Sequence, residues 1–229
     1  MNPDNFLLHL PFFTKNECEE IVNYIERKEK FFKEDEQSQK LLEEAVTYGN
    51  TSNSTRLHSK YNFFLENKKY IPRLKKILEK NFPNLNYPLA VQSWCNLYAK
   101  GQGINWHTHR LFGNFDFPNS FTSNVFVGGR EDIGITYALH HEGDIPRYKY
   151  VNVKNKLGHI QFVKSNIHHM VRSNPYDETR YTIGITVTEF HPVWARSILN
   201  MNDSFSIHGN NILIIPEKEG EDKTNLNYK

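Results

Sequence analysis

The sequence predicts a mainly β domain with helices in its N-terminal part and a jelly-roll core, built as a barrel-like β-sandwich. Three observations lead to this fold class. Helical periodicity is confined to the residues before Pro88. Short strand-like runs, broken by Gly, Asn and Asp, follow it. The chain has 229 residues, of which 38% are hydrophobic and 14% aromatic, so it can bury a core of its own.

The N-terminal part begins with a short apolar stretch, residues 6–10, that ends at Pro11. A helix is expected after it, because Thr14 and Glu17 have the spacing of a capping box. The apolar residues that follow at helical spacing would form the buried face of this helix: Cys18, Ile21, Val22 and Ile25. The charged residues 27–44 either extend this helix or start another.

The next segments indicate a loop, a helix and then strands. Residues 45–60 are rich in Gly, Asn, Ser and Thr and form the loop. An amphipathic helix is expected over about 69–82, with Ile71, Leu74, Ile77 and Leu78 on one face. The expected strands are residues 89–99, 104–109, 121–127, 133–139, 147–153, 158–163, 168–172 and 181–190, with 212–215 as an added strand. Strands of this length and spacing are typical of a sandwich or jelly roll.

These segments predict one domain over residues 1–215. It has a helical part at about 12–85, a jelly-roll core at about 88–190 and a C-terminal extension at 191–215. Residues 216–229 are charged and polar and are expected to form a disordered tail. The loops at 45–60 and 110–120 are the segments expected to cover a substrate.

Composition excludes little beyond a membrane protein. The formal net charge of +2 implies no particular partner, and no stripe of Lys or Arg with interleaved aromatics indicates nucleic acid. No apolar run approaches the roughly 20 residues of a membrane span. The polar residues 1–5 are unlike a secretory leader, and Cys18 and Cys95 are expected to be reduced core residues. We therefore expect a soluble protein in the cytoplasm of a microbe or of an infected host cell.

Eleven histidines are present, and geometry selects among them. His107 and His109 are two apart in a strand-like run, so both side chains would project from one face, close enough to share a metal ion. His-x-His alone equally suits paired surface histidines. The adjacent His168 and His169 must point to opposite faces, so only one of them could join such a site.

The remaining histidines are less promising. His140 and His141 fall where a strand gives way to a polar loop and are expected in a solvated turn. His9 suits a partly buried packing position in the first apolar stretch. Four others have no partner at a useful spacing: His58, His159, His191 and His208.

The C-terminal part contains an ordered series of six residues: Tyr98, Gly101, His107, His109, His169 and Arg180. Residues 162–171 read F-V-K-S-N-I-H-H-M-V, and Asn174, Asp177 and Arg180 follow as a turn of the form N…D-x-x-R. In this series the chain resembles the Fe(II)- and 2-oxoglutarate-dependent oxygenases, and most closely their prolyl-hydroxylase-like and phage-type branch. The resemblance covers about residues 88–190 and, more weakly, the opening helix at 10–25.

This resemblance implies a double-stranded β-helix, cupin-like core that holds one Fe(II) between His107, His109 and His169. The co-substrate 2-oxoglutarate would chelate the ion, and its far carboxylate would pair with the guanidinium of Arg180, which offers a two-pronged fork of donors. Thr182 shares the face of Arg180 and would add a hydrogen bond. O₂ would be the oxidant, ascorbate a supporting reductant, and the reaction a hydroxylation.

Three residues carry more than one interpretation. Tyr98 could contact the co-substrate or pack in the core. Trp94 and Trp106 are expected in the core or in the wall of the pocket. Taken by itself, Arg180 would suit a surface position at the exit of a turn, and its spacing from His169 is what favours the co-substrate role.

One position departs from the family pattern. The usual metal site has two histidines and one carboxylate, and His109 stands where most of the family has Asp. Asp116 is the nearest carboxylate downstream and could replace His109 if residues 111–117 loop back. Strand geometry favours His109.

Two other functions are compatible with these residues. A cupin-like dioxygenase with three histidine ligands could bind its substrate directly, without 2-oxoglutarate. A catalytically inactive binding module could keep the fold. For an active hydroxylase, the resemblance favours a peptide or protein side chain as substrate over a small molecule or a nucleobase.

Overall fold

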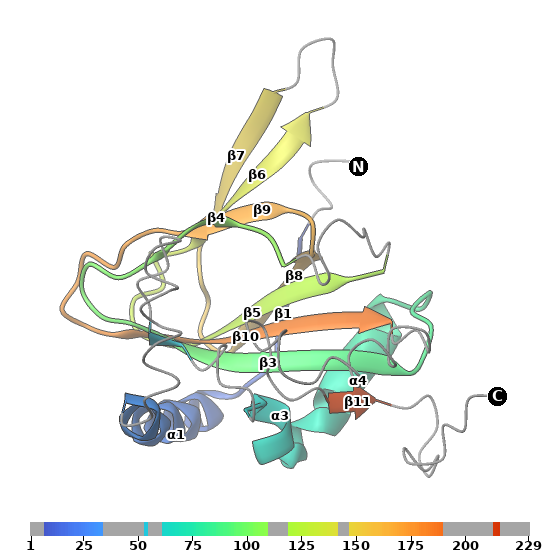
Figure 1. The fold of residues 1–229 in the computed structure, drawn as a ribbon, viewed down its shortest axis with the longest axis horizontal. Helices are drawn as coiled ribbons and strands as arrows, with labels where there is room; N and C mark the ends of the chain where they lie inside the picture. Colours follow the sequence, from blue (N-terminus) through green and yellow to red (C-terminus); the bar gives the residue numbers. More distant parts are fainter. Residues whose placement is uncertain are drawn as a thin grey trace, which may run out of the picture.

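The computed structural model describes residues 7–33, 53–54, 61–109, 119–141, 147–189 and 213–215. Two antiparallel sheets form the described part, and helices cover the outer face of the larger sheet (Figure 1). The expected mainly β fold with N-terminal helices is therefore confirmed. No helix among the described residues is both long and apolar enough to cross a membrane.

The larger sheet, called the major sheet below, has seven strands. Across the sheet they are β1 (Leu8–Pro11), β8 (His159–Lys164), β5 (Phe121–Gly128), β10 (Arg180–Glu189), β3 (Leu89–Tyr98) and β11 (Leu213–Ile215), and the short β2 (Asn53–Ser54) also pairs with β3. The ladder between β10 and β3 is the longest, running from Arg180 opposite Tyr98 to Glu189 opposite Leu89. This ladder forms the rigid floor beneath the site described below.

The smaller sheet, called the minor sheet, has four strands and lies above the major sheet in Figure 1. Its order is β4 (Ile104–His107), β9 (His168–Val171), β6 (Ile135–His141) and β7 (Arg147–Val153). Strands β6 and β7 form a long hairpin that projects away from the major sheet (Figure 1). The two sheets together line the cavity in which the candidate site lies.

The helices are α1 (Lys15–Lys33), α3 (Phe63–Glu66), the short 3-10 helix η3 (Lys68–Tyr70) and α4 (Ile71–Asn81). The expected capping box begins α1: the N–H of Thr14 donates to Glu17 Oε2 (2.8 Å), and the N–H of Glu17 donates to Thr14 Oγ1 (3.2 Å). The expected apolar face of α1 is buried at Cys18, Ile21 and Ile25 and partly buried at Val22.

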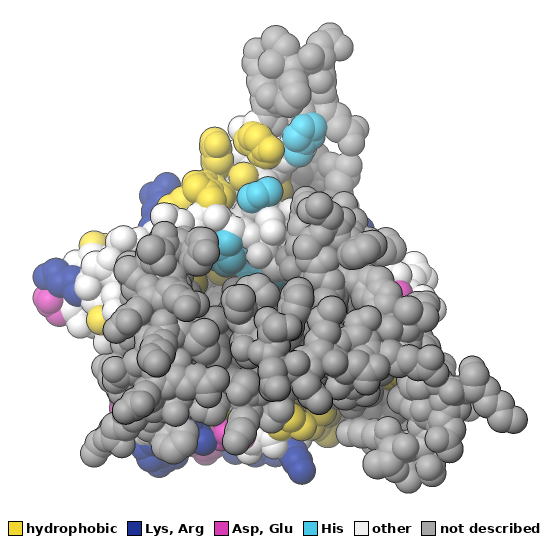
Figure 2. Space-filling view, in the orientation of Figure 1, with side chains coloured by type: hydrophobic (Ala, Val, Ile, Leu, Met, Phe, Trp, Pro, Cys, Tyr) yellow, Lys and Arg dark blue, Asp and Glu magenta, His cyan; other side chains and the backbone are white. Residues whose placement is uncertain are grey.

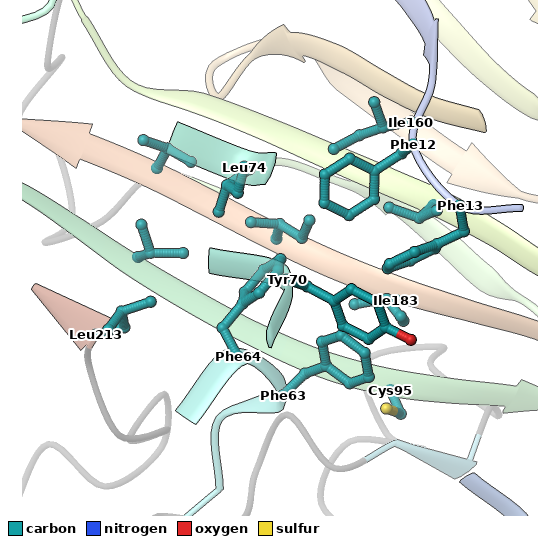
Figure 3. Packing of buried hydrophobic residues seen from close by; sticks show 14 of the residues in the cluster. Phe12, Phe13, Phe63, Phe64, Tyr70, Leu74, Cys95, Ile160, Ile183 and Leu213 are labelled. Carbon is teal, nitrogen blue, oxygen red and sulfur yellow. The ribbon is translucent and has the colours of Figure 1, made fainter. Parts of the chain in front are cut away.

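The main core lies between these helices and the major sheet. Figure 3 shows its aromatic centre, where the rings of Phe13 and Tyr70 are 4.8 Å apart and those of Phe63 and Tyr70 are stacked at 6.1 Å. Cys18 and Cys95 are buried free thiols, and burial raises their pKa to about 11 and about 12. Both cysteines are thus core residues, as the sequence predicts.

A second, smaller core lies between the two sheets. Its buried members are Tyr98, Ile135, Tyr137, Leu139, Val163 and Val171. Both clusters pack against the major sheet, from opposite sides. The major sheet therefore separates the apolar helical layer from the more polar layer that holds the site.

The element boundaries differ from the expected ones in a few places. Strand β6 begins at Ile135, because the carbonyl of Ile133 accepts the side-chain amide of Asn155 and does not join the ladder. It also continues through His140 and His141, which pair with β7, so the expectation that both lie in a solvated turn was wrong. Strands β1 and β2 were not expected as strands, since each is short and gains its ladder only from a distant partner.

Several expectations concern residues outside the described part. They include Asp116, residues 34–44, most of the loops at 45–60 and 110–120, residues 191–212 and the tail at 216–229. The added strand expected at 212–215 is present as β11. The α-helix expected over about 69–82 is α4, with η3 leading into it.

An ion pair ties α1 to α4. Arg73 donates to both carboxylate oxygens of Glu17, at 2.8 Å each, and to the carbonyl of Phe12 at 2.6 Å. The Arg73 hydrogen bonds hold the pKa of Glu17 down, from an ordinary 4.5 to about 2. Because the folded-state pKa is the lower one, the stabilisation is fully present above about pH 4.5 and is lost as the pH falls through about 2.

We predict that Glu17→Gln lowers the free energy of unfolding by about 1 kcal/mol at pH 7, because the two-pronged ion pair with Arg73 is lost while the Gln oxygen still accepts the N–H of Thr14. The difference from the wild type should shrink as the pH falls toward 2. Urea unfolding at several pH values measures both effects. The control is Glu79→Gln, because the exposed Glu79 lies 3.8 Å from Lys75 in a simple i,i+4 pair. Equal stability of Glu17→Gln and wild type at pH 7 would contradict this assignment.

Candidate metal centre

The two histidines on strands face each other directly. His107 on β4 is the cross-strand partner of His169 on β9, and their ring centroids are 4.3 Å apart. A bulge precedes His107, since three steps along β4 from Ile104 match two steps along β9 from Val171. As a result Ile104 and His107 both line the cavity, although strict alternation would have turned one of them away.

His109 completes the cluster from beyond the end of β4. The strand ends at His107, so the expectation of a strand to residue 109 was wrong. The N–H of His109 instead donates to the carbonyl of Ser165, at 3.0 Å, which fixes the backbone next to β9. Its ring centroid lies 5.0 Å from that of His107 and 5.0 Å from that of His169. One ring nitrogen from each of the three histidines lies within 4.8 Å of the other two.

Backbone carbonyls orient two of the rings. Nδ1 of His107 lies 2.7 Å from the carbonyl oxygen of Asn105, and Nδ1 of His169 lies 2.9 Å from that of Ile167. A carbonyl can only accept, so Nδ1 must carry the proton in both rings and the lone pair is left on Nε2. This arrangement is the usual support for a histidine that binds a metal ion through Nε2.

The donor set fits one transition-metal ion. Imidazole nitrogen binds iron, zinc, copper and nickel, at about 2.0–2.1 Å for zinc. Three ligands that converge from one side leave the other positions of the ion open toward the cavity. His168, next to His169, is exposed and lies on the opposite face, as strand alternation predicts.

The cavity beside the histidines is lined by polar and aromatic side chains. Its wall includes Trp94, Asn96 and Tyr98 from β3, Asn124 from β5 and Tyr137 from β6. The Trp94 ring lies 5.4 Å from His109 and the Tyr137 ring 5.8 Å from His169. No carboxylate, lysine or arginine is among the described residues of this wall. Three of these residues, Asn96, Asn124 and Tyr137, were not singled out from the sequence.

Arg180 lies immediately behind this wall and is completely buried, with 0% of its surface exposed. It faces Tyr98 across the β10–β3 ladder, and its guanidinium carbon is 4.7 Å from the Tyr98 ring. One nitrogen, Nη2, donates to Asn155 Oδ1 at 3.5 Å, while Nε and Nη1 have no acceptor among the described residues. The alternative of a surface residue at a turn exit is therefore wrong for Arg180.

Burial lowers the pKa of the Arg180 guanidinium, and the nearby Tyr98 and Tyr137 act in the opposite direction. An arginine keeps its proton even so, which leaves a buried positive charge with no carboxylate partner among the described residues. Buried charges are costly unless they are paired, so an anion bound beside Arg180 would offset the cost of burying its guanidinium.

Thr182 accompanies Arg180 on the same face of β10. It is buried and lies opposite Asn96, whose side-chain amide donates to the Thr182 hydroxyl at 3.3 Å. The hydroxyl hydrogen of Thr182 is then available to donate to an acceptor. The geometry places Thr182 where the sequence predicts it, next to Arg180 and on the cavity side of the sheet.

Asn174 fixes the turn motif relative to the arginine strand. Its side-chain amide donates to the carbonyls of Tyr98 (2.9 Å) and Glu178 (2.8 Å), and the N–H of Gly101 donates to its carbonyl (2.7 Å). Gly101 has φ +81°, a conformation that side chains with a Cβ rarely adopt. Asp177 is exposed and pairs with Lys100 at 3.0 Å. Of these two residues, Asn174 is therefore the one that links the β3–β4 connection to the β9–β10 connection through buried hydrogen bonds.

The two tryptophans have different surroundings. Trp94 is buried in the cavity wall, as expected, but Trp106 is 42% exposed, so its expected place in the core or the pocket wall was wrong. Trp106 instead contacts the exposed ring of Tyr150, at 5.5 Å. Figure 2 shows hydrophobic side chains gathered beside histidines at the top of the molecule, where Figure 1 draws the minor sheet.

Spacing along the sequence also did not reveal the contact between His9 and His159 or the polar side chains of the cavity wall. His9 on β1 and His159 on β8 form an edge-on ring pair at 5.0 Å, although they are far apart in sequence.

We predict that His169→Ala weakens the binding of a single divalent ion by at least about a hundredfold, because one of three ligands is lost. Calorimetric titration of metal-free protein with Co(II) or Zn(II) measures this. His168→Ala is the matched control, since the neighbouring ring lies on the exposed face, and it should bind metal as the wild type does. Unchanged affinity in His169→Ala would refute the site.

No protein-family model matches the sequence, and no curated protein sequence matches it. Solved structures do match the fold. A prolyl-4-hydroxylase from Pseudomonas putida superposes with a TM-score of 0.54 at 11% identity, covering 81% of this chain and 94% of that one. HygX from Streptomyces hygroscopicus, with nickel, 2-oxoglutarate and hygromycin B bound, gives a TM-score of 0.53 at 12% identity, covering 80% and 83%.

A third match is SnoK, a non-heme α-ketoglutarate-dependent carbocyclase from nogalamycin biosynthesis. Its TM-score is 0.51 at 11% identity, and the match covers 92% of each chain. At such identities the likeness concerns the fold alone. The chain has the double-stranded β-helix fold of the Fe(II)- and 2-oxoglutarate-dependent oxygenases, as the sequence resemblance implies, with a histidine cluster that can hold a metal ion in its cavity.

Proposed function

We propose that the protein is a non-haem Fe(II)- and 2-oxoglutarate-dependent dioxygenase that acts as a hydroxylase. His107, His109 and His169 would hold the iron. Arg180, helped by Thr182 and Tyr98, would bind the far carboxylate of 2-oxoglutarate. When bound, iron and 2-oxoglutarate supply the oxidation itself: O₂ is consumed, the co-substrate leaves as succinate and CO₂, and one oxygen atom enters a C–H bond of the substrate.

The observation that carries this proposal is the buried guanidinium of Arg180, which has no carboxylate partner among the described residues. The Nε and Nη1 atoms of Arg180 have no acceptor among the described residues. Arg180 lies on the same face of the major sheet as Thr182, the face toward the cavity. A carboxylate accepts two parallel N–H bonds from such a group. An enzyme that used the three histidines alone, or a module that bound no anion, would have no use for this charge.

The chain's own residues do three things in this scheme. The histidine rings, two of them locked by backbone carbonyls, give the ion a fixed set of three ligands. Arg180 and Thr182 orient the co-substrate from its far end. Tyr98, Tyr137 and Trp94 are buried and exclude water from the space between, which strengthens every electrostatic contact inside it.

For the substrate we propose a peptide or protein side chain ahead of a small molecule or a nucleobase. Support comes from the similarity of the opening helix to prolyl-hydroxylase-like proteins and from the fold likeness to a bacterial prolyl-4-hydroxylase. HygX, whose structure holds hygromycin B, has the same fold, so the fold itself does not select between these classes.

We predict that Arg180→Met abolishes 2-oxoglutarate binding without costing stability. Affinity of the metal-loaded protein for 2-oxoglutarate should fall at least about a hundredfold, because a charge-assisted pair of hydrogen bonds is lost. The free energy of unfolding without ligand should be unchanged or higher, since a buried unpaired charge is removed. Calorimetry and urea unfolding measure the two quantities. Arg172→Met, at an exposed position, is the control and should change neither.

We also predict that the protein with Fe(II), ascorbate and 2-oxoglutarate releases succinate slowly, and faster with a true substrate. The His107→Ala and Arg180→Met variants should release none above background. Succinate can be quantified by chromatography. Wild-type protein that takes up iron but neither binds nor consumes 2-oxoglutarate would exclude the proposed function and favour a three-histidine dioxygenase without a co-substrate.

A further inference from the structure

One edge of the minor sheet has no neighbouring strand. Strand β7 lies at the end of the sheet order and pairs with β6 on one side, and no described residue pairs with its other edge (Figure 1). It is seven residues long, contains no Gly or Pro, and keeps an unbroken register with β6 over its whole length. The backbone N–H and C=O groups along such an edge point away from the sheet, so β7 offers a row of unused hydrogen-bonding groups.

The other strands at the ends of the two described sheets are shorter or interrupted. In the major sheet, β1 has four residues and ends in Pro11, and β11 has three residues. In the minor sheet, β4 has four residues and is interrupted by a bulge. Proteins commonly protect sheet edges in these ways, because a long and regular edge recruits another strand. Among the described end strands, β7 is therefore the one that is suited to accept a strand.

The outer face beside this edge carries exposed aromatic rings. Val151 of β7 packs against the small core between the sheets, so Tyr148 and Tyr150, at alternate positions, lie on the outer face. Tyr148 is 53% exposed, Tyr150 63% and Trp106 42%, and these are the exposed large hydrophobic side chains of the described residues. Tyr150 lies opposite the small Ala138, which leaves room for its ring to contact that of Trp106. Apolar side chains of an added strand would cover both tyrosines.

The opposite face of β7 presents a cation between the two tyrosines. Lys149 is exposed and has no ion pair among the described residues. None of the four strands of the minor sheet contains Asp or Glu. Antiparallel pairing with a second copy, centred on Tyr148, Lys149 or Tyr150, would set the two Lys149 side chains opposite or diagonal to each other, where like charges repel. An acidic side chain of a different partner would be complementary to Lys149.

We propose that β7 is a docking strand for an extended peptide segment of a partner protein, which adds to the minor sheet as a fifth strand. The residues of this segment alternate. Apolar or aromatic side chains pack over Tyr148 and Tyr150, and acidic side chains lie beside Lys149 on the opposite face. Main-chain hydrogen bonds to the free edge supply affinity, and the alternation supplies specificity. The inference goes beyond the proposed function and does not depend on it, because none of these three residues lines the cavity.

The test uses metal-free, full-length protein and a fluorescent, end-capped peptide of alternating Val and Glu, as long as β7. We expect saturable binding by fluorescence anisotropy. Methylation of the backbone nitrogens of the peptide, or its rearrangement into Val-Val-Glu-Glu repeats, should weaken binding at least about tenfold, because the ladder or the alternation is lost. Tyr150→Ala and Lys149→Glu should each weaken binding about threefold to tenfold. Lys80→Glu, at an exposed position of α4, is the matched control and should bind the peptide as the wild type does.

Several results would overturn the inference. One is wild-type protein that does not bind the alternating peptide at millimolar concentration. Another is equal binding of the methylated peptide, since strand addition needs its N–H donors, or of the rearranged peptide, since the two faces of β7 are then not distinguished. A dimer in sedimentation that Tyr150→Ala converts to a monomer would show that a second copy occupies the edge.

Zinc titration and urea unfolding identify misfolded variants. Tyr150→Ala and Lys149→Glu should keep the metal affinity and stability of the wild type, because both side chains are exposed and lie outside the cavity. Peptide binding is measured without metal or 2-oxoglutarate, so its failure would leave the proposed function intact, and a failure to release succinate would leave the docking strand intact.

Discussion

The pairing of β4 with β9 is the contact on which the candidate site depends. It sets His107 directly opposite His169, and the bulge before His107 turns that ring and Ile104 to the same side. Strand β6 continues the same register, because Tyr137 is also a cross-strand partner of His169. The histidine cluster is therefore a property of sheet register, and a slip of one residue would turn its rings to the outer face.

The second requirement is a fixed position of the minor sheet relative to the major sheet. Asn174 meets it by binding the backbone on both sides: the carbonyl of Tyr98 at the end of β3 and the carbonyl of Glu178 just before β10. The turn at Gly101 that leads into β4 donates to Asn174 in return. One buried side chain thus relates the strand that carries His107 to the strand that carries Arg180.

The electrostatic character of the cavity follows from the lack of a carboxylate among the described residues of its wall. A usual carboxylate ligand would offset part of the charge of a bound ion, whereas a His109 ligand would add no negative charge. Arg180 adds a buried positive charge nearby. With an ion bound, they would together make the cavity more positive than a two-histidine, one-carboxylate site. Functional sites commonly keep such destabilising features because the ligand satisfies them.

Sequence reasoning recovered the architecture and all three histidines of the cluster for identifiable reasons. Periodicity found α1, α4 and the main strands, and the capping box at Thr14 and Glu17 was correct in detail. It failed where a position depends on a distant partner. The place of His109 is set by Ser165, the burial of Arg180 by the β10–β3 ladder, and the exposure of Trp106 by a bulge. Asn124 was missed because only the assembled sheet shows that its side chain lines the cavity.

The division of the core into two clusters has a consequence for how the protein opens. The helical side of the major sheet packs a large aromatic cluster, whereas the minor sheet rests on six buried residues and short strands. Local opening free energy follows buried apolar contact, so amides of β4 and β9 should exchange with solvent far sooner than those of β3 and β10. An ion bound across β4 and β9 would cross-link the weakest part of the molecule. Metal binding would thereby raise the opening free energy of the minor sheet, so that both sheets would unfold as one cooperative unit.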